Sequence, residues 1–275
     1  MTLAAAPWNA QHWDGSWLVI PDLHGHAARL DAALQQAARH PASRLAFLGD
    51  LIDDSPRRRE ARKAGTMPGT PDDSRQILAT VRALHGSGRA EVLLGNHEVM
   101  AMASVIDDHR PLMDVWWRVG GREAAASYGW KGKGEAGELA GDLRWLRENG
   151  RLWLSIGPPG AEVLLSHATR PSPSRYLSGQ NRAADLTPSS ANDEVVWLPL
   201  GLESDNDARL RSLSLLDERF TASLHGHMET PDIWTLLDMQ DRPAHQLDLH
   251  PARRRLALMH VDSQGKLTPQ VVRVA

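Results

Sequence analysis

The 275 residues carry a formal net charge of −3, with 41% hydrophobic and 24% charged side chains and no cysteine. This composition is typical of a globular protein and gives no general attraction to nucleic acid or lipid, so we expect neither a nucleic-acid duplex nor a membrane as partner. The lack of cysteine excludes disulfides and thiolate metal sites. Any metal must be held by oxygen and imidazole ligands, which suit manganese first, with iron or zinc as alternatives.

No basic segment followed by an apolar run opens the chain, and no run approaches the roughly 18 apolar residues of a membrane span. We therefore expect a cytoplasmic protein without a signal peptide. Tryptophan is unusually frequent, with 10 Trp against 2 Tyr and 2 Phe. We interpret these side chains as core residues, because no basic stripe accompanies them as it would on a base-stacking surface.

Three strand–turn–helix units begin the chain. The apolar runs Trp17–Ile20, Arg44–Leu48 and Ala90–Leu94 predict buried strands. Apolar residues at helical spacing predict helices over 27–40 and 75–84. Because helices separate successive strands, this order predicts a parallel sheet with right-handed crossovers.

Between the second strand and the second helix, the stretch Ser55–Pro71 is rich in Arg, Lys, Pro and Gly. This composition predicts an exposed insertion. The residues Asp72, Asp73 and Ser74 follow it directly, and they predict the N-cap of the next helix.

The second half of the chain changes from helical to strand patterns. Residues from about 99 to 150 predict a helical cap, in which we interpret the tryptophans as structural rather than catalytic. Pro, Ser and Asn concentrate between about 169 and 206 and predict a loop or lid. The predicted strands are Leu152–Ile156, Glu162–Ser166, Phe220–Leu224, and the hairpin Ala257–Val261 with Gln270–Val274. We expect an α/β (α+β) fold of two mixed sheets packed face to face with flanking helices, in a single domain spanning 1–275.

Polar side chains stand at the ends of five predicted strands, where α/β proteins bind their ligands. The stretches are PDLHGH (21–26), GDLIDD (49–54), GNHE (95–98), SHA (166–168) and HGH (225–227). They supply six candidate ligands for divalent metal ions, namely Asp22, His24, Asp50, Asn96, His167 and His227. Asp50 lies between the two halves of this set and is the natural bridge. Two ions about 3.5–4 Å apart would bind substrate oxygens and generate hydroxide for in-line attack on phosphorus.

His97 follows Asn96 directly, so we expect its side chain to point away from the metals and to donate a proton to the leaving group, oriented by Asp53. Each site residue also has a structural interpretation. Aspartate is a typical N-cap residue of helices, and asparagine, as at position 96, is a common turn residue. A buried histidine is often a hydrogen-bonded core residue with a structural role only. We expect His225 to be such a buried histidine, because it faces away from His227. The repetition of one pattern at five strand ends favours the metal site.

The motifs PDLHGH, GDLIDD, GNHE, SHA and GHM resemble the signature series of calcineurin-like metallophosphoesterases. Their form is similar to that of the phosphoprotein phosphatase branch and its bacterial relatives, which include diadenosine tetraphosphate hydrolases. The resemblance implies a four-layer αββα fold and two divalent ions. It implies that the first ion is held by Asp22, His24 and Asp50. It implies that the second is held by Asp50, Asn96, His167 and His227. It also implies a proton-donating dyad of His97 and Asp53.

The chain departs from this family where arginines are thought to grip the phosphate. Asp54, Leu94 and Leu198 stand at those positions. Candidates to replace them are Arg170 and the run 57–59, although such a run is also typical of a solvated surface. We expect hydrolysis of phosphomonoesters, on a serine/threonine phosphoprotein or a small phosphorylated molecule. The alternatives are a dinucleoside polyphosphate hydrolase or phosphodiesterase, and a non-catalytic binding protein on a phosphatase scaffold.

Overall fold

A computed structural model describes residues 11, 13–53, 72–171, 173–183, 186, 194–197, 218–238, 240–249 and 254–274. Its strands form two mixed five-stranded sheets. The first has the order β10-β9-β1-β2-β3, with β1 (Trp17–Ile20), β2 (Arg44–Phe47), β3 (Ala90–Val92), β9 (Arg255–Val261) and β10 (Leu267–Arg273). The second has the order β4-β5-β6-β8-β7, with β4 (Trp153–Ile156), β5 (Glu162–Ser166), β6 (Phe220–His225), β7 (Trp234–Leu237) and β8 (Pro243–Gln246).

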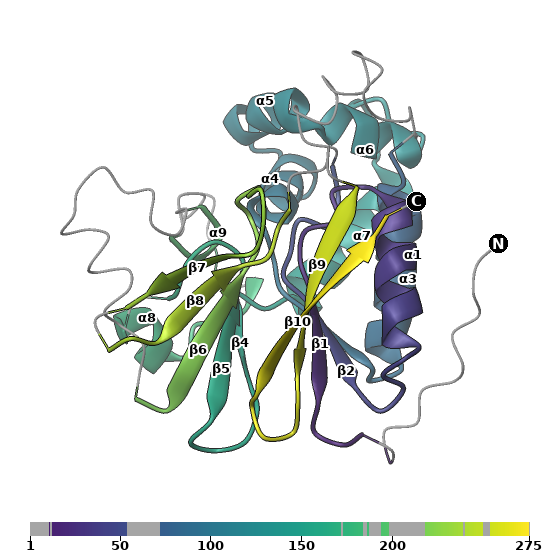
Figure 1. Cartoon of the computed structure of the whole chain (residues 1–275). Coiled ribbons are helices and arrows are strands. Elements are labelled where there is room, and N and C mark those ends of the chain that lie inside the picture. The colour runs from purple at the N-terminus through teal and green to yellow at the C-terminus, as the bar shows by residue number, and fades with distance from the viewer. Residues whose placement is uncertain are drawn as a thin grey trace.

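Eight helices lie within the described ranges. They are α1 (Ala27–Ala37), α3 (Ser74–Gly86), α4 (Asn96–Val105), α5 (Arg110–Val119), α6 (Gly121–Ser127), α7 (Gly137–Asn149), α8 (Pro173–Ser178) and α9 (Glu194–Trp197). Figure 1 shows α1 and α3 outside the first sheet and α4, α5 and α6 at the top of the molecule. The molecule is an α/β sandwich, as the sequence predicts. Helices α4 to α7 fall where a helical cap was expected, and the assignment of the chain to one domain stays a prediction.

The alternation of side chains along β1 explains how the first sheet is packed. Leu18 and Ile20 are fully buried in a cluster that includes residues of α1 and α3. Trp17 and Val19 belong to a second cluster, which contains residues of β5 and β6 from the other sheet. Because successive side chains of a strand point to opposite faces, β1 is covered by helices on one side and by the second sheet on the other. The core therefore holds the two sheets against each other.

The last two strands of the chain, β9 and β10, form the predicted hairpin. β9 pairs antiparallel with β10 from Leu267–Val261 to Arg273–Arg255. Asp262 closes the turn, because its Oδ1 accepts hydrogen bonds from the backbone N–H groups of Gln264 and Lys266. This prediction is confirmed.

Strands β7 and β8 were not predicted from the sequence. β8 begins with a proline and reads PAHQ, which is too short and too polar to show a strand pattern. It forms a strand because it pairs parallel to β6, from Ser223–Ala244 to His225–Gln246. Tertiary pairing thus decides this element, and the residues that follow it reach the same edge as those that follow β6.

The start of α3 differs in detail from the prediction. Asp73 occupies the N-cap position but makes no capping hydrogen bond. Instead Asp72 Oδ1 accepts from the backbone N–H of Ser74 at 2.8 Å. Asp73 Oδ2 accepts from the backbone N–H of Ala27, at the start of α1, at 3.4 Å. The two aspartates therefore join the beginnings of two helices.

Two predicted surface segments fall partly or wholly outside the described residues. They are the insertion at 55–71 and the loop or lid at about 169–206, of which the short helices α8 and α9 are described. Among the described helices, none is both long and apolar enough to cross a lipid bilayer.

Candidate metal centre

The structure brings the six predicted ligands together at one edge of the sandwich. Asp22 follows β1, Asp50 follows β2 and Asn96 opens α4 directly after β3. From the second sheet, His167 follows β5 and His227 follows β6. All but His227 are buried, and His227 is half-buried. The parallel strands of both sheets therefore direct their carboxyl ends to a common site, as expected for an α/β fold.

The predicted ligands of the second ion are tightly clustered. Nε2 of His167 lies 3.1 Å from Asn96 Oδ1 and 3.4 Å from Asp50 Oδ2. Nδ1 of His227 lies 3.1 Å from Asn96 Oδ1 and 3.2 Å from His167 Nε2. Four ligands arranged as a tetrahedron at about 2.1 Å from an ion would be about 3.4 Å apart. The spacing of these atoms fits a divalent ion.

The tautomer of His167 also fits metal binding. Its Nδ1 lies 2.9 Å from the backbone oxygen of Leu48, and a carbonyl oxygen only accepts hydrogen bonds. Nδ1 must therefore carry the proton, which leaves the lone pair of Nε2 directed at the cluster. The same argument holds for His24, whose Nδ1 donates to the backbone oxygen of Asp53 at 3.0 Å.

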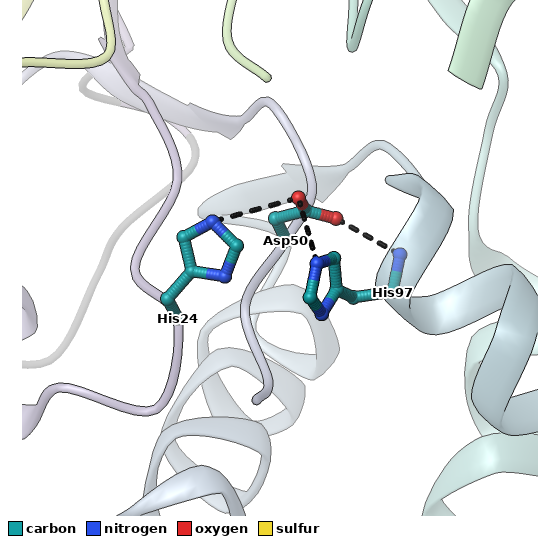
Figure 2. A group of neighbouring side chains, drawn as sticks. All are labelled: His24, Asp50 and His97. Carbon is teal, nitrogen blue, oxygen red and sulfur yellow. Dashed lines mark hydrogen bonds and ion pairs between the residues drawn. The ribbon is translucent and has the colours of Figure 1, made fainter. Parts of the chain in front are cut away.

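Asp50 stands between the two groups of ligands. Its Oδ2 lies 3.6 Å from Nε2 of His24 and 3.4 Å from Nε2 of His167. Figure 2 shows the carboxylate between His24 and His97. Oδ2 of Asp22 lies on the His24 side, 3.7 Å from the same nitrogen. This arrangement is compatible with the bridging role predicted for Asp50.

His97 and Asp53 form the hydrogen-bonded pair that the sequence predicts. Nδ1 of His97 lies 3.0 Å from Asp53 Oδ2, and its backbone N–H donates to Asp50 Oδ1 at 3.1 Å. The ring does not turn away from the cluster as expected, since Nε2 lies 3.9 Å from Asp50 Oδ2 (Figure 2). Burial opposes a charge on the ring, but Asp50 and Asp53 outweigh it and raise the pKa of His97 to about 9. The protonated ring is therefore favoured.

Trp116 is a site residue that the sequence interpretation missed. Its Nε1 donates a hydrogen bond to Asp53 Oδ2, the oxygen that also contacts His97. The side chain is fully buried and stacks on Trp117, with ring centroids 5.0 Å apart. The sequence interpretation of the tryptophans in this helical region as structural rather than catalytic does not account for the contact of Trp116 with Asp53. No local signal in the sequence distinguishes it from its neighbour.

Glu98 is a second residue whose contribution only the structure reveals. Its carboxylate accepts hydrogen bonds from the backbone N–H groups of Gly95, Asp50, Leu51 and Ile52, at 2.8 to 3.2 Å. Burial and the nearby charge of Asp50 raise the pKa of Glu98 to about 7. The side chain clamps the turn that presents Asp50. The position of Glu98 in the GNHE motif is the sequence feature that could have pointed to this role.

The backbone at the site is strained. Four non-glycine site residues have left-handed backbone conformations, a state that costs about 1–3 kcal/mol each and is typical of functional sites. They are His24 (φ 48°), Asp50 (φ 46°), Asp53 (φ 65°) and His227 (φ 70°). The glycine of the HGH motif is required by close packing, because a Cβ atom on Gly226 would collide with Oδ1 of Asp22.

One further carboxylate borders the site. Asp248, which follows the unpredicted strand β8, has a ligand atom within 4.8 Å of ligand atoms of Asp22 and His24. Its carboxylate is fully buried. The sequence interpretation could not include it, because its position depends on the pairing of β8 with β6.

The structure also shows the surroundings of Leu94 and Arg170, two positions that were considered for phosphate binding. Leu94 is fully buried in the core, and Arg170 does not replace the missing arginines. The guanidinium of Arg170 is buried, donating from Nε to Ser223 Oγ at 2.9 Å and from Nη1 to Asp238 at 3.2 Å. Asp54, Leu198 and the arginines at 57–59 lie outside the described residues.

His225 has the environment that the sequence predicts. It is fully buried, and its two ring nitrogens contact the hydroxyl groups of Ser166 and Ser223 at 3.1 and 2.8 Å. Burial, together with the charge of Arg170, holds the pKa of His225 well below its usual value. It is a hydrogen-bonded core histidine.

Taken together, the sandwich and its cluster of Asp, His and Asn side chains define a metallophosphoesterase. The model of the calcineurin-like phosphoesterase family matches residues 16–231. The chain belongs to this family and is a phosphoester hydrolase. The search of curated proteins found no match.

Solved structures share the fold at low sequence identity. A serine/threonine phosphatase from Saccharomyces cerevisiae, described as similar to human phosphatase PP5, is 14% identical with a TM-score of 0.58, over 95% of this chain and 81% of that one. A metallophosphoesterase from Sphaerobacter thermophilus is 15% identical with a TM-score of 0.51, over 94% and 88%. A cold-active protein tyrosine phosphatase is 16% identical with a TM-score of 0.50, over 93% and 78%.

Proposed function

We propose that the protein is a hydrolase of phosphomonoesters that uses two divalent ions, with manganese as the first candidate. Its substrate would be a phosphoprotein or a small phosphorylated molecule. The observation that carries this proposal is a cluster of four ligand atoms beside the His24 group and the His97–Asp53 pair. Within it, the ligand atoms of Asn96, His167 and His227 lie 3.1 to 3.2 Å from one another, and Asp50 Oδ2 lies 3.4 Å from His167 Nε2. Asp22, His24 and Asp50 would hold one ion. Asp50, Asn96, His167 and His227 would hold the other.

The residues of the chain have separate tasks in this mechanism. When bound, two divalent ions polarise the phosphoryl oxygens and lower the pKa of a water molecule that attacks phosphorus. Leu48 and Asp53 fix the tautomers of His167 and His24 through their backbone oxygens. His97 gives its Nε2 proton to the leaving oxygen, while Asp53 holds Nδ1 and stabilises the imidazolium.

Substitution of His97 tests the separation between proton donation and metal binding. His97→Ala should lower kcat by about 10²-fold or more, because general acid catalysis contributes about that much. Two equivalents of manganese should remain bound by elemental analysis. As the matched comparison, Asp50→Ala should release both ions, because this carboxylate borders both groups. Equal loss of metal in the two variants would contradict the role of His97, and two bound ions in Asp50→Ala would contradict the bridge.

A dinucleoside polyphosphate hydrolase or phosphodiesterase is the second candidate. It is favoured by the burial of Leu94 and by the pairing of Arg170 with Asp238, since neither position offers an arginine to a phosphate dianion. The manganese-loaded protein should be assayed side by side on p-nitrophenyl phosphate, bis(p-nitrophenyl) phosphate, a phosphopeptide and diadenosine tetraphosphate. Turnover of either monoester supports the first proposal, and turnover of the dinucleotide alone replaces it. A metal-loaded protein inert on all four, with tight binding of a partner, indicates a non-catalytic role.

A further inference from the structure

Asp248 reaches the candidate metal centre from a strand that contributes no other predicted ligand. It follows β8, and one of its oxygens lies within 4.8 Å of ligand atoms of Asp22 and His24. All three side chains are buried, with Asp22 and Asp248 fully so. Asp248 therefore borders the first group of predicted ligands.

The hydrogen bonds of the two aspartates show a shared pattern. Oδ2 of Asp22 accepts from the backbone N–H of His227 at 2.9 Å, and its buried Oδ1 has no hydrogen-bond partner. Oδ1 of Asp248 accepts from Nη2 of Arg29 at 2.7 Å, and its buried Oδ2 has no hydrogen-bond partner. A buried, unpaired carboxylate oxygen is costly, whereas a ligating carboxylate typically has one oxygen on a metal and the other on a hydrogen-bond donor.

The contact with Arg29 also differs from that of a self-sufficient ion pair. Arginine and carboxylate commonly pair through two parallel hydrogen bonds. Here only Nη2 of Arg29 contacts Asp248, while its buried Nε and Nη1 have no hydrogen-bond partner. The arginine thus orients the carboxylate by one oxygen and leaves the other available.

We propose that Asp248 is a fourth protein ligand of the first ion and that Arg29 orients it. This inference rests on the proposed binding of two ions. It gives each ion four protein ligands, the first through Asp22, His24, Asp50 and Asp248. Three carboxylates then face the four positive charges of two divalent ions, and Arg29 balances the carboxylate oxygen that does not face the ion.

Manganese binding to three single variants tests the proposal by isothermal titration and elemental analysis. Asp248→Asn should raise the dissociation constant of one ion at least tenfold and leave that of the other within threefold. Arg29→Met should weaken binding of the same ion by no more than about threefold, because Asp248 keeps its charge and loses only the contact that orients it. The matched control is Asp238→Asn, a buried aspartate paired with Arg170 and Arg242 away from the cluster, which should bind both ions as the parent does.

If Asp248 served only to pair with Arg29, the Asp248→Asn and Arg29→Met variants would behave alike. Retention of both ions by Asp248→Asn, or loss of the same ion from both variants, would overturn the proposal. Should Asp248→Asn not fold, Asp248→Ser is titrated in its place. The same tenfold weakening of one ion is expected, and binding of both ions with the affinity of the parent would overturn the proposal.

The same titrations separate this inference from the proposed function. A parent protein that binds two ions and hydrolyses phosphomonoesters, together with an Asp248→Asn variant that binds both ions equally well, refutes only the role of Asp248. A parent that binds fewer than two ions refutes the two-ion site and the fourth ligand together.

Discussion

At the scale of single residues, Asp53 shows how one side chain can join the proposed chemistry to the fold. Its Oδ2 contacts Nδ1 of His97 and accepts a hydrogen bond from Trp116. Burial raises the pKa of Asp53 to about 6, although both hydrogen-bonded partners favour its charged form. Trp116 therefore acts on His97 through Asp53, and we regard it as a positioning residue.

Trp116→Phe tests this positioning role. A hydrogen bond to a charged group contributes about 1.5–3 kcal/mol, and we expect kcat to fall about tenfold as part of that contribution is lost. KM and manganese content should stay unchanged, because the substitution removes a donor to Asp53 and touches no predicted ligand. Steady-state kinetics with elemental analysis measure both.

Trp117→Phe is the matched control for Trp116→Phe. Trp117 stacks on Trp116 but has no hydrogen bond to Asp53 among those described. It should therefore keep the kcat of the parent. An equal fall of kcat in both variants would mean that packing in this helical region, rather than the hydrogen bond, supports the reaction.

The ionisation of Asp72 makes the free energy of unfolding depend on pH. Burial raises its pKa from 3.8 to about 6, so the neutral form is favoured in the folded protein. Its favourable contribution is full below pH 4 and is lost as the pH rises through 6. Between pH 4 and pH 8, the unfolding free energy of Asp72→Asn should shift relative to the parent by up to about 3 kcal/mol in favour of the variant. Urea denaturation at both pH values measures this, and a pH-independent difference would refute it.

At the scale of elements, Glu98 ties the first turn of α4 to the turn after β2. Four backbone N–H groups donate to its carboxylate, from Gly95 and from the stretch 50–52. Because a carboxylate has two acceptor oxygens and no donor when ionised, it suits four converging N–H groups better than an amide does. The turn that presents Asp50 is therefore held by a side chain from the next strand–helix unit.

Glu98→Gln should destabilise the protein by about 1–3 kcal/mol, because the amide NH2 would face backbone donors in a buried position. Chemical denaturation measures the loss. Glu138→Gln provides the comparison, since that exposed glutamate pairs with exposed Arg75 and its substitution should cost about 0–1 kcal/mol. Similar losses in the two variants would show that the buried clamp carries no special weight.

At the scale of the whole molecule, the candidate metal centre is built from both sheets. Asp22 and Asp50 come from the first sheet, whereas His167, His227 and Asp248 come from the second. An ion bound between them stabilises the packed state by mass action, by about 2.7 kcal/mol at a concentration of 100 times its dissociation constant. Chelation should therefore lower the Tm, and manganese should restore it, in calorimetry. A Tm unchanged by either treatment would contradict metal binding across the sheets.

Local sequence patterns are sufficient to predict much of this fold and of its candidate site. Short apolar runs ending in DLHGH, GD and GNHE specify β1, β2 and β3, because local hydrophobic patterning and turn glycines act within a few residues. The same motifs placed all six candidate ligands at strand ends, and the resemblance they carry indicated the family that the comparison then confirmed.

Other features of the fold and of the candidate site depend on contacts between distant segments of the chain. β8 becomes a strand by pairing with β6, and this pairing brings Asp248 beside Asp22. The hydrogen bond of Trp116 to Asp53 and the commitment of Arg170 to Asp238 likewise join residues more than 60 positions apart in the chain. Such contacts depend on how sheets and helices pack, which no local pattern encodes, because burial and long-range pairing are properties of the assembled fold.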